Sequence, residues 1–173
     1  MKKRLCCTLL IIWALSLSMV TSAQKPQDKH IKVLIFMDTE CPVTQSYAPE
    51  LRKMYAEYSV KGIEFESVFP VYTVGQKDID RFLKLYKIPF SGTPDVSHKR
   101  VNRYHASVMP EAVLLDKNGM VVYQGAIDNW YFGLGKNRPK ATETYLRNAI
   151  EAALNGNPVM VKKTNAVGCL INN

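Results

Sequence analysis

The chain has 173 residues and a formal net charge of +8, and 22% of its residues are charged. Its basic residues lie among acidic ones, as in residues 77–81, which is typical of a solvated surface and argues against the clustered basic footprint of a nucleic-acid-binding protein. The one local basic cluster, at residues 98–100 and Arg103, is interpreted in the same way. We therefore expect no nucleic-acid partner.

The first residues predict where the protein works. Three basic residues at positions 2–4 precede an apolar stretch at 5–20 and the small residues 21–23. This order is typical of a cleavable signal peptide, so residues 1–23 are predicted to be one and the protein to be periplasmic or otherwise exported and secreted. A transmembrane anchor is the weaker alternative, because the apolar stretch of 16 residues is shorter than the ~20 that a spanning helix needs. Membrane contact is then expected only through this segment, if it stays uncleaved.

The rest of the chain is predicted to form one domain and a tail. Removal of residues 1–23 leaves about 150 residues, which is enough for a single hydrophobic core. No internal repeat, low-complexity tract or interdomain linker divides this part of the sequence. We predict a domain at residues 24–157 and a C-terminal tail at 158–173 that carries Cys169.

Hydrophobic patterns predict the elements of this domain. A continuous apolar run predicts a buried strand at residues 33–37, and apolar side chains at helical spacing predict a helix at 42–60. A second strand at 63–69 should be parallel to the first, because a helix connects them. Further along, the patterns predict helices at 76–87 and 96–105, a hairpin of strands 112–115 and 121–123, and a last helix at 142–154. This order predicts an α/β fold with a central mixed β-sheet flanked by helices.

Cys41 is the residue where chemistry is expected first. It follows the strand at 33–37 directly and opens the helix at 42–60, so its thiol lies at a strand-to-helix turn. Unpaired backbone N–H groups and the positive end of the helix dipole favour the thiolate there, the form that is both nucleophile and metal ligand. The neighbouring Asp38 and Glu40 oppose this effect.

Cys169 is the candidate partner of Cys41. Cys6 and Cys7 lie inside the predicted signal peptide, so the exported chain would hold only two cysteines. An oxidising compartment favours a disulfide between them, and the tail is long enough to cross a small domain, since ten extended residues span ~33 Å. Such a bond would either cycle between oxidised and reduced forms or act as a permanent staple. Two unrelated cysteines, one of them simply buried, remain the alternative.

The placement of these residues resembles the thioredoxin fold, in its redoxin branch of alkyl-hydroperoxide-reductase/thiol-specific-antioxidant-like proteins. Cys41 lies at the start of the first long helix, Pro49 follows eight residues later, and Met109-Pro110 precedes the hairpin where this fold has its cis-proline. The resemblance covers residues 31–154. It implies a thioredoxin-like three-layer fold.

Departures from known redoxins narrow the expected chemistry. Peroxiredoxins have a threonine and a proline where this chain has Asp38 and Leu34. The sequence therefore favours disulfide exchange over peroxidase activity. Copper chaperones of the fold carry CxxxC, and here the second position is Gln45. Thioredoxins and the reductases of cytochrome c maturation carry CxxC, and here that position is Thr44. The chain is therefore similar to an exported redoxin-domain protein that lacks CxxC.

The resemblance also implies roles for residues near the thiol. Met109 and Pro110 would form the substrate-docking edge, with a cis peptide bond between them. Glu111 is a candidate proton acceptor, with an exposed strand-end carboxylate as the alternative. Trp130 lies in the glycine-flanked segment 125–141, which is long for a strand-to-helix connection and is predicted to form a binding lip. Alternatively, its aromatic side chains fill a satellite core.

We therefore predict an exported thiol-disulfide oxidoreductase of the thioredoxin-like superfamily, with Cys41 as nucleophile and Cys169 as its distant partner. No bound cofactor or metal is expected. The partners would be protein or small-molecule thiols and disulfides, together with a periplasmic electron donor. The alternative is a non-enzymatic redoxin-like module with a structural Cys41–Cys169 disulfide, which would bind another molecule or handle copper, because soft thiolates select Cu(I).

Overall fold

The computed structural model describes residues 30–172, so the predicted signal peptide lies outside the described residues. Within residues 30–172, no helix is long and apolar enough to cross a membrane. The elements in chain order are β1 (Lys32–Phe36), α1 (Pro42–Tyr58), the 3-10 turn η2 (Ser59–Lys61), β2 (Glu64–Phe69), α2 (Gln76–Leu85), β3 (Gly92–Pro94), α3 (Lys99–Tyr104), β4 (Val108–Met109), β5 (Glu111–Leu115), β6 (Val121–Gly125), β7 (Tyr131–Gly133), β8 (Lys136–Asn137), α4 (Tyr145–Leu154) and β9 (Cys169–Leu170).

The central sheet has the strand order β3-β2-β1-β5-β6. β1 is parallel to β2, which is parallel to β3, while β5 is antiparallel to both β1 and β6. The parallel pairs arise because helices connect those strands, whereas a four-residue turn at 116–119 allows β5 and β6 to pair directly. The predicted mixed sheet is confirmed.

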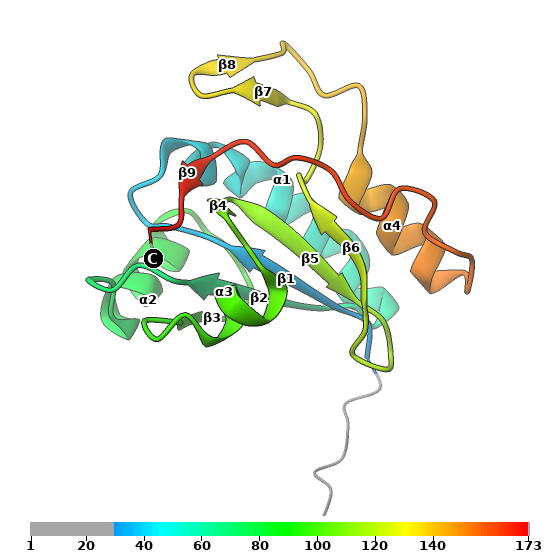
Figure 1. Cartoon of the computed structure of the whole chain (residues 1–173), viewed down its shortest axis with the longest axis horizontal. Coiled ribbons are helices and arrows are strands. Elements are labelled where there is room, and N and C mark those ends of the chain that lie inside the picture. Colours follow the sequence, from blue (N-terminus) through cyan, green and yellow to red (C-terminus); the bar gives the residue numbers. More distant parts are fainter. Residues whose placement is uncertain (1–29, 173) are drawn as a thin grey trace, which may run out of the picture.

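Helices cover both faces of the sheet (Figure 1). Alternate residues of β1 point to opposite faces, so that Val33 and Ile35 join one core and Leu34 and Phe36 the other. The first core packs against α1, α2 and α4, and the second against the short helix α3. The predicted thioredoxin-like three-layer fold is confirmed.

Several helix ends differ from those predicted, because single residues leave the helical conformation. α2 ends at Leu85 and not at residue 87, where Lys87 has a φ of 53°. α3 has six residues and not ten, because His98 and His105 on either side of it both have left-handed φ values. α1 ends at Tyr58, and its last predicted residues form the 3-10 turn η2.

α4 begins at Tyr145, three residues later than predicted. The backbone N–H groups of Thr142 and Glu143 donate to Oδ1 of Asn129 at 2.9 and 3.1 Å. A side chain from a distant loop therefore satisfies donors that a helix start would otherwise leave unpaired.

Five short strands were not predicted: β3 at the sheet edge, the pair β4–β9, and the pair β7–β8 inside the segment expected to be a loop. Strands of two or three residues are too short to show an alternating pattern. The pair β4–β9 matters most, because it joins the tail to the region that precedes the β5–β6 hairpin.

The tail follows a defined path from α4 across the sheet edge to β4 (Figure 1). It first runs beside β6, where Gln124 N–H donates to Lys162 O at 2.9 Å and Thr164 N–H donates to Gln124 O at 3.1 Å. Gly125 permits this approach, because a Cβ there would lie 2.3 Å from Thr164 O. The tail is therefore packed against the domain before it reaches Cys169.

Candidate functional site

Cys41 lies at the strand-to-helix turn, as predicted, and its side chain is 1% exposed. It occupies the N-cap position of α1 with an extended backbone, and Pro42 follows as the first helical residue. Its Sγ donates a hydrogen bond to the backbone O of Met109 at 3.2 Å. The turn is thus tied to β4, the strand that precedes Pro110.

The tail brings Cys169 to the same place. In the antiparallel pair β4–β9, Cys169 lies opposite Met109. Met109 O also accepts the hydrogen bond of Cys41 Sγ, so both cysteines lie beside the same residue. Two cysteines 128 positions apart in the sequence are therefore neighbours, and both are thiols in the structure. The disulfide between them stays a prediction.

The surroundings of Cys169 favour its neutral thiol. Burial of the side chain is the largest cause, and the hydrogen bond to Cys41 and the charges of Cys41 and Asp38 act in the same direction. Together they raise the pKa of Cys169 above its ordinary value of 9.0. The Cys169 side chain is therefore mainly a protonated thiol at neutral pH, which is a poor nucleophile. A change in its environment is needed before it reacts quickly.

Gly168 allows the tail to approach β4 closely. A Cβ built on Gly168 would lie 2.0 Å from the backbone O of Met109 and 2.5 Å from its carbonyl carbon. Backbone atoms cannot move aside as the end of a flexible side chain can, so only glycine fits here. The peptide bond between Met109 and Pro110 is cis, as expected. The sequence prediction included Cys169 but missed the requirement for glycine before it.

Glu111 is buried, and its carboxylate accepts three hydrogen bonds. Oε2 accepts from the backbone N–H groups of Ser107 and Val108 at 2.9 and 3.4 Å, and Oε1 accepts from Gln124 Nε2 at 2.7 Å. These contacts hold the backbone around β4, so Glu111 is well placed to position that strand. Its predicted role as a proton acceptor stays a prediction.

Trp130 is half-buried and belongs to an aromatic cluster beside α1. Its ring packs edge-on against Tyr47, with ring centroids 5.5 Å apart, and against Tyr131 at 5.0 Å. Its Nε1 donates to Arg138 O at 2.8 Å, which closes the base of the β7–β8 hairpin. The side chain thus fills a small core under the hairpin, while Phe132 at the hairpin itself is 56% exposed. The predicted substrate-binding role of Trp130 stays a prediction.

Asp128 and Tyr47 form a buried polar pair that sequence reasoning missed. The Tyr47 hydroxyl donates to Asp128 Oδ1 at 2.6 Å, and the Trp130 N–H donates to the same oxygen at 2.8 Å. Burial raises the pKa of the Asp128 carboxyl above its ordinary range, although both hydrogen bonds oppose that shift. Burial also raises the pKa of Tyr47. In the sequence Tyr47 lies in the predicted helix at 42–60, and no sequence signal marks its hydroxyl.

Thr44 lies three residues after Cys41, at the spacing that makes helix side chains neighbours. It is fully buried. Among residues 30–172, its hydroxyl is the one buried side-chain oxygen or nitrogen without a hydrogen-bond partner. Such a hydroxyl is costly for stability.

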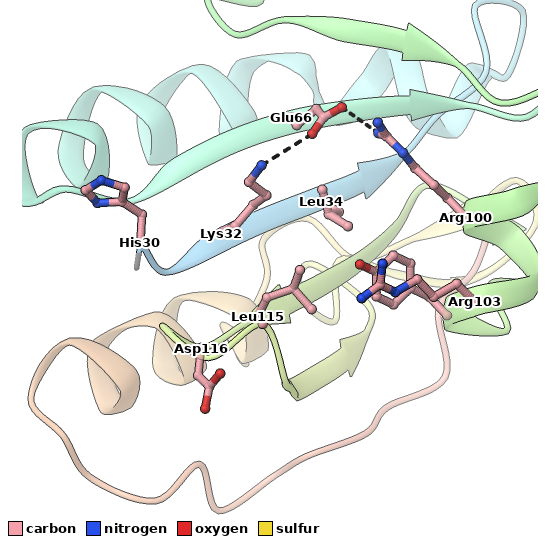
Figure 2. Close-up of a pocket in the computed structure, with 10 residues that line it drawn as sticks. His30, Lys32, Leu34, Glu66, Arg100, Arg103, Leu115 and Asp116 are labelled. Carbon is pink, nitrogen blue, oxygen red and sulfur yellow. Dashed lines mark hydrogen bonds and ion pairs between the residues drawn. The ribbon is translucent and has the colours of Figure 1, made fainter. Parts of the chain in front are cut away.

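Two hollows lie on the surface of the domain, and one of them is near Cys41. One of about 440 Å³ borders the Cys41 turn and is lined by Thr39, Glu40 and Gln45 together with residues of α2. The other, of about 280 Å³, lies on the α3 face of the sheet (Figure 2). Figure 2 shows that Lys32 and Arg100, which line it, both point to Glu66 and form ion pairs with it. Arg100 of the basic sequence cluster therefore has an acidic partner.

The described part of the chain contains no group of three or more histidine, cysteine, aspartate or glutamate side chains placed to hold a metal ion. In these residues the copper-handling alternative would therefore find no third histidine, cysteine, aspartate or glutamate ligand beside the two thiols. Two thiolates are ligands that suit Cu(I).

The chain is similar to proteins of known sequence and structure. The chain is 28% identical to the thiol-disulfide oxidoreductase ResA of Bacillus cereus over 89 residues, and it spans about half the length of that relative. A solved structure of an uncharacterized conserved protein from Geobacillus kaustophilus matches 85% of this chain and 79% of its own, with a TM-score of 0.75 and 22% identity. A protein from Chlorobium tepidum, assigned provisionally as thiol:disulfide interchange protein DsbE, matches 74% of this chain and 82% of its own, with a TM-score of 0.59 and 25% identity. The model of the AhpC/TSA family matches residues 18–124, which is more than half of the chain, and the protein belongs to this family.

Proposed function

We propose that the protein is a thiol-disulfide oxidoreductase in which Cys41 is the nucleophile and Cys169 the resolving thiol. One observation carries the proposal: the tail strand sets Cys169 opposite Met109, whose backbone O accepts the hydrogen bond of Cys41 Sγ, so that the two cysteines are neighbours. A relative named thiol-disulfide oxidoreductase supports the same chemistry. The protein would supply both sulfurs itself, without a CxxC motif.

The reaction needs two exchanges. In the first, the Cys41 thiolate attacks one sulfur of a substrate disulfide, a mixed disulfide forms, and the other substrate sulfur leaves as a thiolate. In the second, the Cys169 thiolate attacks the Cys41 sulfur, which releases the remaining substrate thiolate and leaves a Cys41–Cys169 disulfide. The two protein thiols are thereby oxidised and the substrate disulfide is reduced to two thiols. A dithiol donor then reduces the protein for the next cycle.

Neighbouring residues have roles in this proposal that follow from their contacts. Met109 accepts the Cys41 hydrogen bond and lies opposite Cys169, so that it and Pro110 would position both sulfurs and the docking edge. Glu111 would hold the backbone of that edge in place. Trp130 would fix the base of the β7–β8 hairpin as the lip beside the site.

The test is turnover of a small aromatic disulfide with dithiothreitol as electron donor. Turnover is measured as the release of the coloured aromatic thiolate. With dithiothreitol, wild-type protein should turn over and Cys41→Ser should fall to the uncatalysed rate. In a single turnover of the pre-reduced protein without dithiothreitol, wild type should release two coloured thiolates and Cys169→Ser should stop at the mixed disulfide after one. A double variant, Cys41→Ser with Cys169→Ser, measures the background rate that any other thiol contributes. Equal turnover by wild type and Cys41→Ser would overturn the proposal.

We also propose that the protein works in the periplasm or another exported compartment. The support is the order of basic, apolar and small residues at positions 1–23. The partners would then be thiols and disulfides of exported proteins or small molecules, and a periplasmic dithiol donor. Cell fractionation with mass spectrometry of the mature N-terminus tests both the location and the cleavage.

A second candidate function is a non-enzymatic binding module whose Cys41–Cys169 bond is a permanent staple. It is favoured by the burial of Cys41, whose side chain is 1% exposed, and by the raised pKa of Cys169, since both slow thiol exchange. The two candidates differ in one measurable property. A staple would resist mild reduction while the protein stays folded, whereas a redox pair would open and close.

A further inference from the structure

The tail binds β4 in the way that an added peptide strand binds a sheet edge. Cys169 and Leu170 pair antiparallel with Met109 and Val108. The pairing continues for one more residue, where Ile171 N–H donates to Ser107 O at 3.0 Å. Main-chain hydrogen bonds of this kind depend little on side chains, so another extended segment can make them equally well.

The strand that the tail forms on β4 is short. β9 has two residues, and together with β4 it forms a separate two-stranded sheet. Leu170 is 71% exposed, so its side chain buries little apolar surface. Cys169 and Ile171 pack against the two cores, but the strand pair itself is short, and short two-stranded pairs are marginal, so β9 should open before the rest of the protein does.

We propose that the β4 edge beside Cys41 is a binding site for an extended peptide segment with a glycine directly before its cysteine, and that tail residues 167–171 occupy this site as an internal stand-in until such a segment displaces them. The proposal rests on the proposed function and adds to it the class of substrate. The substrate would be a flexible protein segment that carries a Gly-Cys pair in a disulfide.

The requirement for glycine follows from the geometry of the tail. A substrate cysteine that Cys41 can attack must take nearly the place of Cys169. The residue before it then takes the place of Gly168, where a Cβ would lie 2.0 Å from Met109 O and 3.0 Å from Pro110 N. Both are backbone atoms of the docking edge itself. The next position is permissive, because Leu170 points largely to solvent.

The site would be used by substrate and tail in turn. The substrate strand displaces the tail, and the Cys41 thiolate forms a disulfide with the substrate cysteine while the partner sulfur of the substrate leaves with the electron pair. When the tail returns to β4, the Cys169 thiolate attacks Cys41 and the substrate thiolate departs. Return of the tail thus both resolves the mixed disulfide and expels the product.

The test uses two short peptides, Ala-Val-Gly-Cys-Leu-Ile and Ala-Val-Ala-Cys-Leu-Ile, each activated as a mixed disulfide with thionitrobenzoate. The protein carries Cys169→Ser, so that one coloured thiolate is released for each attack by Cys41. The Gly-Cys peptide should react about tenfold faster than the Ala-Cys peptide. Adding Gly168→Ala to the protein, which displaces the tail, should speed the reaction of the Gly-Cys peptide at least tenfold. The symmetric aromatic disulfide, which needs no strand pairing, serves as the reference substrate.

The outcomes separate this inference from the proposed function. If both peptides react at the same rate while the aromatic disulfide reacts with Cys41, the glycine-selective edge is wrong and the oxidoreductase proposal stands. If Gly168→Ala leaves the peptide rate unchanged, the tail does not compete for the site and the inference is overturned. If no disulfide reacts with Cys41, the inference and the proposed function both fail.

Discussion

Replacement of Gly168 by alanine should release the tail from the domain. The added Cβ would lie 2.0 Å from Met109 O, closer than any non-bonded carbon and oxygen can approach, and the clash is with backbone. The tail should therefore leave β4 and lose roughly three backbone hydrogen bonds at ~1 kcal/mol each, so the free energy of unfolding should fall by about 2 to 3 kcal/mol. Urea denaturation measures this change. Hydrogen exchange of the Ile171 amide, which donates to Ser107 O, reports release of the tail directly.

Gly133→Ala is the matched control for this experiment. A Cβ at Gly133 meets nothing closer than 3.5 Å, the side-chain Cδ of Lys136, so the same substitution should change stability by less than about 0.5 kcal/mol. Protection of the Ile171 amide should be as in wild type. If Gly168→Ala is as stable as Gly133→Ala and keeps its Ile171 amide protected, the close approach of tail and β4 is wrong.

Three further predictions concern the site and its surroundings. Oxidation of Cys41 and Cys169 to a disulfide should raise the free energy of unfolding by about 4 to 5 kcal/mol, because the bond closes a loop of about 128 residues. Urea denaturation of oxidised and reduced protein measures this difference, which should be absent in Cys169→Ser. Thr44→Val should raise stability by about 1 kcal/mol in the same assay, because it removes a buried hydroxyl without a partner in the described residues, and a loss of stability would contradict this reading of Thr44. The raised pKa of Asp128 stabilises the fold fully below its ordinary value of 3.8, and this contribution is lost as the pH rises through the folded-state pKa. Asp128→Asn should therefore remove that part of the pH dependence of stability above its ordinary value of 3.8, and a wild-type-minus-variant difference that stays unchanged as the pH rises from there would count against it.

Long elements with strong periodicity were predictable from sequence. The apolar run at 33–37 predicts β1, and the helical spacing of apolar side chains predicts α1. Cys41 was correctly placed at the turn between β1 and α1. The mixed sheet followed because connection length decides whether strands are parallel. These features depend on local patterns that a single sequence displays.

The rest depends on contacts between distant segments. β9 has two residues and exists only because β4 is beside it, so neither strand has a pattern of its own. Asn129 shortens α4 through bonds to Thr142 and Glu143, which no helix propensity reveals. Likewise, Asp128 becomes buried only when the hairpin folds onto α1, so its bond to Tyr47 could not be foreseen.

The central claim is that Cys41 and Cys169 form a reversible redox pair, and one measurement tests it most directly. The folded protein is equilibrated in buffers of increasing ratio of oxidised to reduced dithiothreitol, quenched by alkylation, and mapped by mass spectrometry, with circular dichroism recorded at each step. The account predicts a single two-electron transition in which the Cys41–Cys169 disulfide forms and opens while the fold stays intact. A protein that never forms this bond, or that releases it only on unfolding, would contradict the account.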